Sequence, residues 1–205
     1  MVRLRAEDRR RMILRAAGDL FIARGFAGVT MEDVIAAAGG SKSTIYQQFS
    51  DKTDLFRAAV ESLLDERSEP LRTFVPSSAD LARTLVELGR DFATVALSPE
   101  SIALHRLVSA EAERVPGLGE AFFDHGPRAG QRVLGGVLQA AADAGLVAIE
   151  DPILAAAQLY QAMLGDVQMR LLTDSPQVPT DEEIERSIAY AVRVFLHGVA
   201  LRPRE

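Results

Sequence analysis

The segment from Thr30 to Phe56 carries the side chains whose types and spacing point most clearly to a chemistry. Its central run, SKSTIYQQF, gathers hydroxyl and amide groups and lacks carboxylates and arginines. An amide can bond adenine through two contacts, and a hydroxyl can bond either kind of base edge in a DNA groove. The two lysines of the chain, Lys42 and Lys52, flank the run, where phosphates should pass. The chemistry indicated is DNA recognition.

Two short helices joined by glycines must position these groups. Thr30 is expected to cap the first helix, Gly39-Gly40 breaks it, and Ser41 caps a second helix that ends near Phe49. At about 100° per residue, Ile45 and Phe49 share the buried side of this second helix, and Ser43 and Gln47 point the opposite way. The pattern predicts a helix-turn-helix, followed by a helix that Ser50 caps.

The whole chain is predicted to be all-α, with about nine helices, because apolar residues recur at spacings of three and four. We expect a three-helix DNA-binding domain over residues 1–54 and a helical effector-binding and dimerisation domain over residues 55–205. The segment 69–78, with two prolines and two serines, is the best candidate boundary, and helix four should bridge the two parts. Further helices are expected near 79–97, after 98, and at 118–125, 128–144, 152–173 and 180–197.

Charge is divided in the same way as the predicted domains. The 205 residues carry a net charge of −6, but residues 1–54 hold nine basic and seven acidic side chains. The remaining 14 basic and 22 acidic groups make residues 55–205 clearly acidic. An acidic body disfavours indiscriminate DNA binding and leaves the basic part to meet phosphate.

Several functional classes find little support in the sequence. No apolar run reaches the length of a membrane span, and charges interrupt the N-terminus where a signal peptide needs its apolar core, which favours a cytoplasmic protein. There are no cysteines, and the three histidines are far apart, so no metal site or cofactor is expected. Glu111 and Glu113 lie two apart on a helix and cannot form a catalytic pair. The sequence does not predict an enzyme.

The run from Gly25 to Phe56 resembles the N-terminal domain of TetR-family transcriptional regulators. The resemblance implies DNA contacts at Thr30, Ser41, Lys42, Ser43, Thr44, Tyr46, Gln47, Gln48 and Lys52. Ser43 stands where the family often has glycine, and Gln48 where it often has histidine, which affects the operator sequence and not the fold. The run LHRLVSAEAERVPGLGEAFFDHGP and the sequence after it resemble AefR-like effector domains of the same family.

This second resemblance implies a homodimer joined through the last two long helices, with a ligand cavity in each subunit. An apolar cavity with a few polar points suits a small hydrophobic effector. The candidate ligand contacts are Leu64, Leu88, Phe92, His105, Phe122, Leu138, Tyr160, Gln161 and Leu164. The candidate dimer contacts are Gln158, Gln168, Ile188, Val192, Phe195 and Leu196.

The expected function is a ligand-responsive repressor that binds a palindromic operator as a dimer. Two alternatives stay open: a DNA-binding regulator without small-molecule input, whose C-terminal half serves dimerisation or a protein partner, and an enzyme on a helical scaffold. The N-terminal arginines add one further expectation, contact with a minor groove or with phosphates. They are Arg3, Arg5, Arg9, Arg10 and Arg11.

Overall fold

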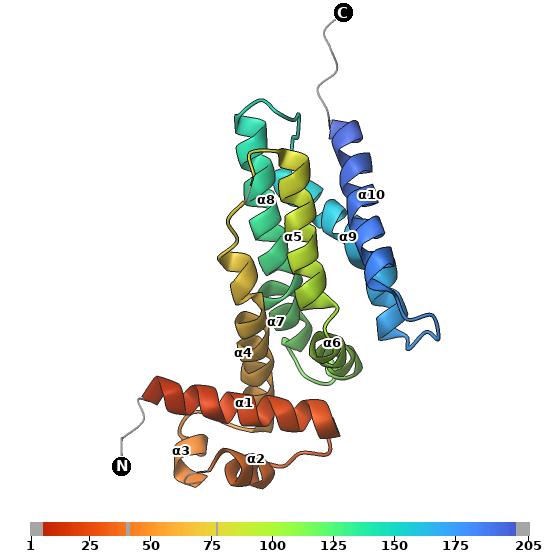
Figure 1. Ribbon diagram of the computed structural model, residues 1–205. Helices are drawn as coiled ribbons and strands as arrows, with labels where there is room; N and C mark the ends of the chain where they lie inside the picture. Colours follow the sequence, from red (N-terminus) through yellow and green to blue (C-terminus); the bar gives the residue numbers. More distant parts are fainter. Residues whose placement is uncertain (1–5, 40–41, 77, 200–205) are drawn as a thin grey trace, which may run out of the picture. The chain divides into compact units, whose positions relative to one another are not determined.

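The computed structural model describes residues 6–39, 42–76 and 78–199, and these fold into ten helices without strands (Figure 1). The all-α prediction is therefore confirmed, with one helix more than the expected number. The helices are α1 (Ala6–Arg24), α2 (Met31–Ala38), α3 (Lys42–Tyr46), α4 (Lys52–Arg72), α5 (Leu81–Ala96), α6 (Pro99–Glu111), α7 (Leu118–His125), α8 (Pro127–Asp143), α9 (Pro152–Leu172) and α10 (Asp181–Val199).

Packing divides the chain into two compact units. Unit 1 combines the residues up to 67 with residues 103–126, and unit 2 combines residues 68–102 with those from 127 onward. The predicted division after residue 54 concerns function and stays a prediction. The packing division falls later because α4 continues through Pro70 to Arg72, and because the second half of α6 and all of α7 pack with the N-terminal helices.

Unit 2 is a helical bundle in which α8 packs on α9, α9 on α10, and α5 on α10. Its core is aliphatic apart from an edge-to-face contact between Phe92 and Tyr160, whose ring centroids lie 5.3 Å apart. Gly89 allows a close approach, because a Cβ there would lie 2.6 Å from Ile188 Cγ2. The small residue therefore lets α5 approach α10 closely.

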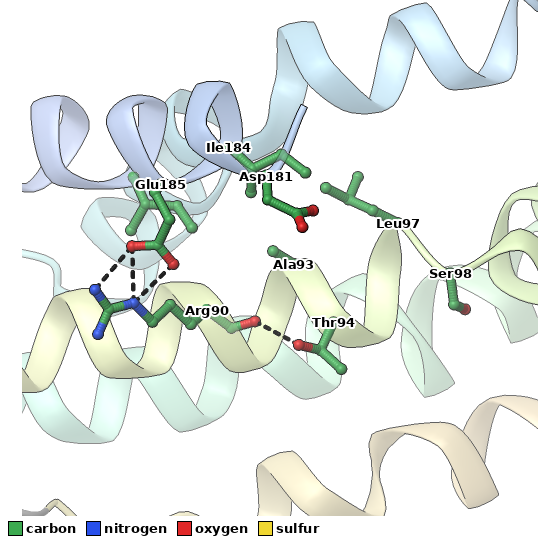
Figure 2. Close-up of a pocket in the computed structure, with 9 residues that line it drawn as sticks. Arg90, Ala93, Thr94, Leu97, Ser98, Asp181, Ile184 and Glu185 are labelled. Carbon is green, nitrogen blue, oxygen red and sulfur yellow. Dashed lines mark hydrogen bonds and ion pairs between the residues drawn. The ribbon is translucent and has the colours of Figure 1, made fainter. Parts of the chain in front are cut away.

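A surface groove of about 470 Å³ opens between α5 and α10 in unit 2. Figure 2 shows Arg90 and Glu185 facing each other across it, joined by hydrogen bonds of 2.8 to 2.9 Å. The pairing raises the pKa of Arg90 and lowers that of Glu185, chiefly through these hydrogen bonds. Both side chains are about half exposed, so the pair links the two helices but adds little to stability.

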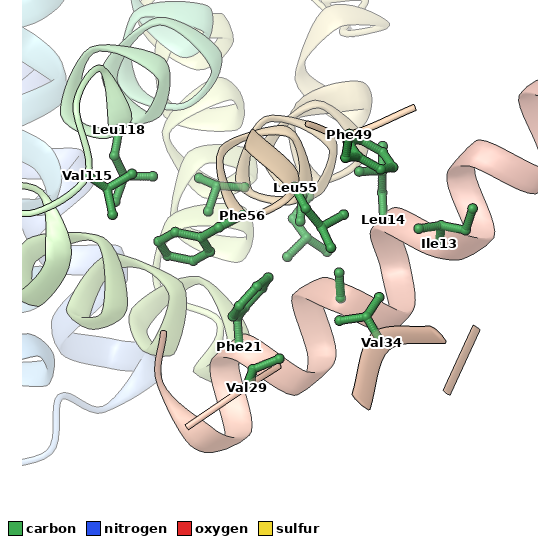
Figure 3. Close-up of a cluster of buried hydrophobic side chains, with 14 of the residues drawn as sticks. Ile13, Leu14, Phe21, Val29, Val34, Phe49, Leu55, Phe56, Val115 and Leu118 are labelled. Atoms are coloured by element: carbon green, nitrogen blue, oxygen red, sulfur yellow. The ribbon is translucent and has the colours of Figure 1, made fainter. Parts of the chain in front are cut away.

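Unit 1 has an aromatic core between α1 and α4. The ring centroid of Phe56 lies 4.7 Å from that of Phe21 and 5.0 Å from that of Phe26, so the turn after α1 is packed against α4. Figure 3 shows that Val115 and Leu118, at the turn between α6 and α7, reach the same cluster. Residues from the middle of the chain thus complete the core of the helix-turn-helix unit.

Thr30 caps α2 as expected, and with Asp33 it forms a capping box. Thr180 and Glu183 form the capping box of α10. Ser50 was the predicted cap of α4, and this was wrong. The Asp51 carboxylate instead accepts from the Asp54 backbone N–H at 2.9 Å. Aspartate is at least as good a cap as serine, so the helix begins one residue later than expected.

Neither a membrane-spanning helix nor a metal-binding cluster is found in the described part of the chain. None of its helices is both long and apolar enough to span a lipid bilayer. Nor do three or more histidine or carboxylate side chains gather there in a way that could hold a metal ion.

Candidate nucleic-acid interface

The second helix of the helix-turn-helix, α3, is held by two buried side chains. We call it the reading helix, because it carries the groups expected to contact bases. Ile45 and Phe49 are each 1% exposed and belong to the core of unit 1, as their spacing predicts. The regular helix ends at Tyr46, three residues before the predicted end. Helical hydrogen bonds nevertheless continue, because the Phe49 backbone N–H donates to the Ile45 carbonyl at 3.0 Å. The short helix therefore has a fixed face toward the core and a fixed face toward solvent.

Four of the nine predicted DNA contacts are exposed on or directly after α3. Lys42, Ser43, Tyr46 and Gln47 are exposed, and Thr30 is exposed at the start of α2. These side chains share the surface that the helix-turn-helix presents away from its own core. They have the types that bond base edges and phosphates.

Two predicted contacts are less exposed, and a third cannot be compared. Thr44 is half-buried beside the exposed face. Gln48 is half-buried too, and its Oε1 is enclosed without a hydrogen-bonding partner in the described structure. Ser41 lies outside the described residues. The DNA contacts of all three stay predictions.

Lys42 is paired within the helix-turn-helix itself. Its Nζ donates to Glu32 Oε1 at 3.0 Å and lies 5.5 Å from the centre of the Tyr46 ring. The hydrogen bond raises the pKa of Lys42 and lowers that of Glu32. Glu32 belongs to the first turn of α2, where the helix dipole favours a carboxylate. The sequence does not reveal the contact of Glu32 with α3.

Lys52 points into the unit. Its Nζ donates to the carbonyl oxygens of Phe26 and Val29, both at 3.0 Å, and lies 4.3 Å from the centre of the Phe26 ring. The ammonium thus fastens the start of α4 to the turn that precedes α2. A phosphate contact by Lys52 stays a prediction, but the lysine has a structural task that the sequence did not reveal.

The N-terminal arginines of α1 also have partners inside the chain. Arg9 donates to the Gly39 carbonyl oxygen, and the Arg10 guanidinium lies 4.6 Å from the centre of the Phe49 ring. Arg11 bonds Asp8 at 2.8 Å. Arg9 therefore contacts the start of the turn after α2, and Arg10 contacts Phe49, which lies shortly after the end of α3. Arg3 and Arg5 lie outside the described residues.

The candidate effector contacts divide between the two units. His105 and Phe122 lie in unit 1 with ring centroids 4.9 Å apart, and burial lowers the pKa of His105. Burial raises the pKa of Tyr160 to about 12. Gln161 was expected to face the interior, and this is wrong, because it is exposed on α9. The remaining candidates are buried, Leu64 in unit 1 and Leu88, Phe92, Leu138 and Leu164 in unit 2.

The candidate dimer contacts need a correction on α10. Ile188 and Val192 are 0% and 2% exposed inside unit 2, so they pack against their own chain. Phe195 and Leu196 are half-buried against the same core. On α9, Gln168 is half-buried and Gln158 is exposed. The apolar stripe with spacings of four and three is the core stripe of one subunit.

The outward apolar face of α10 consists of residues that are not among the candidate dimer contacts. Tyr190 is 59% exposed and Val194 is 53% exposed. Together with Gln158 and Ala162 of α9 they line a groove of about 360 Å³. Their spacing of four would have identified them once the core stripe was assigned.

Comparisons with known proteins agree with this architecture. The profile described as "AefR-like transcriptional repressor, C-terminal domain" matches residues 83–198, and that of "Bacterial regulatory proteins, tetR family" matches residues 13–59. A solved structure of a putative TetR-family transcriptional regulator from Mesorhizobium loti superposes with a TM-score of 0.87 and 29% identity, covering 97% of this chain and 100% of that one.

Two further relatives are regulators whose names describe a function. The flavonoid-responsive regulator FrrA superposes with a TM-score of 0.79 and 29% identity, over 96% of this chain and 100% of that one. The transcriptional activator FasR of Mycolicibacterium smegmatis is 32% identical over 93 residues, which are 44% of this chain and 42% of FasR. The chain thus spans about two fifths of the length of the curated relative, in contrast to the full coverage of the solved structures.

The contrast between the two lysines gives a prediction about stability. We expect Lys52→Met to lower the free energy of unfolding by about 1–3 kcal/mol, because the Phe26 and Val29 carbonyls lose their donor. Lys42→Met is the matched control and should change it little, because that ammonium lies on the surface. Chemical denaturation followed by circular dichroism measures both. Equal effects of the two substitutions would contradict the structural task of Lys52.

Proposed function

The chain belongs to the TetR family of transcriptional regulators, and we propose that it is a dimeric repressor released from a palindromic operator by a small hydrophobic effector. One observation carries the proposal: the exposed side of α3 offers Lys42, Ser43, Tyr46 and Gln47 to solvent while Ile45 and Phe49 anchor the helix. Such a face suits a major groove. DNA-binding regulators of this family are not enzymes, and nothing in the described site calls for a reaction.

Binding as a dimer follows from the geometry of DNA. Two copies of α3 would enter successive major grooves about 34–36 Å apart, on the two halves of a near-palindromic operator. Lys42 would contact phosphate at the edge of each groove, and Ser43 and Gln47 would contact base edges. A single five-residue reading helix offers too few contacts to select one site in a genome.

The subunit contact is proposed on the groove between α9 and α10. Tyr190 and Val194 expose apolar surface there, beside Gln158 and Ala162. An isologous contact of this face with its copy would bring four helices together. Phe195 and Leu196, half-buried at its edge, would be covered further, whereas Ile188 and Val192 would stay in the subunit core.

The repressor assignment and the effector class draw on the relatives. The profile that matches residues 83–198 is described as that of a repressor, and its match covers more of the chain than the alignment with the activator FasR. The similar regulator FrrA is described as flavonoid-responsive. A planar, largely apolar compound of this kind fits the expectation of a small hydrophobic effector, and flavonoids are the first class to test.

Unit 1 offers a physical route by which an effector signal could reach the DNA face. Val115 and Leu118 of the α6–α7 turn share a core with Phe56 of α4 and Phe21 of α1. At the other end of α7, the His125 ring nitrogen Nδ1 lies 3.0 Å from the Asp65 carboxylate of α4. A shift of α6 and α7 would therefore be felt by α4, which begins six residues after α3 ends. This supports a coupling between effector and operator.

The operator contacts generate the first prediction of function. A selection from random double-stranded DNA at about 150 mM salt, where non-specific binding is weak, should recover one palindromic site. On that site, Lys42→Ala should weaken binding to all sequences and flatten its salt dependence, because a phosphate contact is lost. Gln47→Ala should mainly relax base preference. Identical behaviour of the two variants would show that the reading face is misplaced.

The dimer contact gives a second prediction. Val194→Glu should convert the dimer to a monomer, because burying an unpaired carboxylate in an apolar contact is costly. Val75→Glu is the matched control, since Val75 is 80% exposed between α4 and α5. Analytical ultracentrifugation measures the mass, and fluorescence anisotropy measures operator binding. A dimer that survives Val194→Glu would place the subunit contact elsewhere.

The proposed response to an effector gives a third prediction. A flavonoid that binds the protein should weaken operator affinity by roughly 5- to 150-fold, the range of typical couplings, and the operator should weaken flavonoid binding by the same factor. Anisotropy with labelled operator and calorimetry with the compound measure the two directions. If compounds bind and operator affinity never moves, the regulator acts without small-molecule input, and the C-terminal half serves dimerisation or a protein partner.

A further inference from the structure

The ion pair between Glu32 and Lys42 joins the two helices of the helix-turn-helix on their exposed side. Glu32 is the second residue of α2 and Lys42 the first of α3, and their side chains are 65% and 66% exposed. An exposed pair of this kind contributes little to folding. Its position matters more than its strength, because Lys42 is the cation proposed to meet DNA phosphate.

The neighbouring carboxylate, that of Asp33, has different partners. Asp33 accepts hydrogen bonds from the Thr30 backbone N–H at 2.8 Å and from its hydroxyl at 2.6 Å, and lies 3.6 Å from an Arg24 nitrogen. The capping hydrogen bonds lower the pKa of Asp33. Asp33 therefore serves the start of its own helix, whereas Glu32 reaches across to the reading helix.

We propose that Glu32 is a further determinant of operator affinity, acting as an internal substitute for phosphate on Lys42. The inference rests on the proposed DNA contact of Lys42. For Lys42 to bind a phosphate oxygen, its ammonium must leave Glu32 or share itself between two anions. The freed carboxylate then stands beside the phosphates and repels them.

This arrangement changes the salt dependence as well as the affinity. A protein cation releases DNA counterions when it neutralises a phosphate, at about 0.9 units of log–log slope for each contact. A lysine already neutralised by a carboxylate releases fewer. Glu32 thus lowers the electrostatic part of binding on every sequence, so that base contacts by Ser43 and Gln47 carry a larger share of the total.

The test is Glu32→Gln, compared with Glu66→Gln as a control of equal charge change. Glu66 also forms an exposed ion pair within unit 1, 2.7 Å from Arg15, but on α4. Affinity for the selected operator and for a scrambled duplex is measured by anisotropy between about 50 and 200 mM salt. Glu32→Gln should strengthen binding to both duplexes and steepen the plot of log affinity against log salt by up to about 0.9 per subunit. The gain in affinity should therefore be roughly threefold larger per subunit at the lower salt than at the higher salt. Glu66→Gln should leave the slope unchanged.

A Lys42→Ala background separates the two ideas. There, Glu32→Gln should strengthen binding less than it does beside an intact Lys42, because the cation that Glu32 occupies is gone and only the relief of carboxylate–phosphate repulsion remains. If Lys42→Ala alone leaves affinity and slope unchanged, the proposed DNA face fails and this inference falls with it. If Lys42→Ala weakens binding but Glu32→Gln matches its control or weakens binding too, the DNA face stands and only the role of Glu32 is overturned.

Discussion

The burial of Ile45 and Phe49 is the contact on which the DNA-binding surface depends. A helix of five residues has no stability of its own, because nucleation costs more than so few hydrogen bonds return. α3 therefore exists only where the core of unit 1 holds it, and its outward side chains inherit that orientation. The same core includes Phe21, Phe56 and, from the α6–α7 turn, Val115. Anything that alters this packing alters the reading face.

The charged groups around the turn divide into two tasks. Lys52 and Arg9 donate to backbone carbonyls, and Arg10 lies on the Phe49 ring, so these three cations fasten the turn and the ends of its helices. Lys42 lies on the surface and has a carboxylate for a partner. A cation bonded to carbonyls serves the fold whether or not DNA is present. A cation bonded to an exposed carboxylate can exchange that partner for phosphate, which makes Lys42 the group where electrostatic tuning is possible.

Sequence patterns predicted local structure well and the partners of side chains poorly. The cap at Thr30, the burial of Ile45 and the exposure of Gln47 all follow from local sequence patterns. The partners of Lys52 lie 23 and 26 residues away, and spacing within a helix carries no information about them. The face of α10 was misassigned for a related reason. Periodicity identifies an apolar stripe but does not say whether it meets its own chain or a second copy.

The acidic balance of the chain and the pairing of Lys42 act in the same direction. A net charge of −6 works against non-specific attraction to DNA, and Glu32 removes part of what the helix-turn-helix would add. Non-specific binding is almost wholly electrostatic, whereas binding to an operator also draws on base contacts. A reading face poor in free charge but rich in hydroxyl and amide groups therefore loses more on random DNA than on its own site. Weak electrostatics then favour binding to the operator over binding to random DNA.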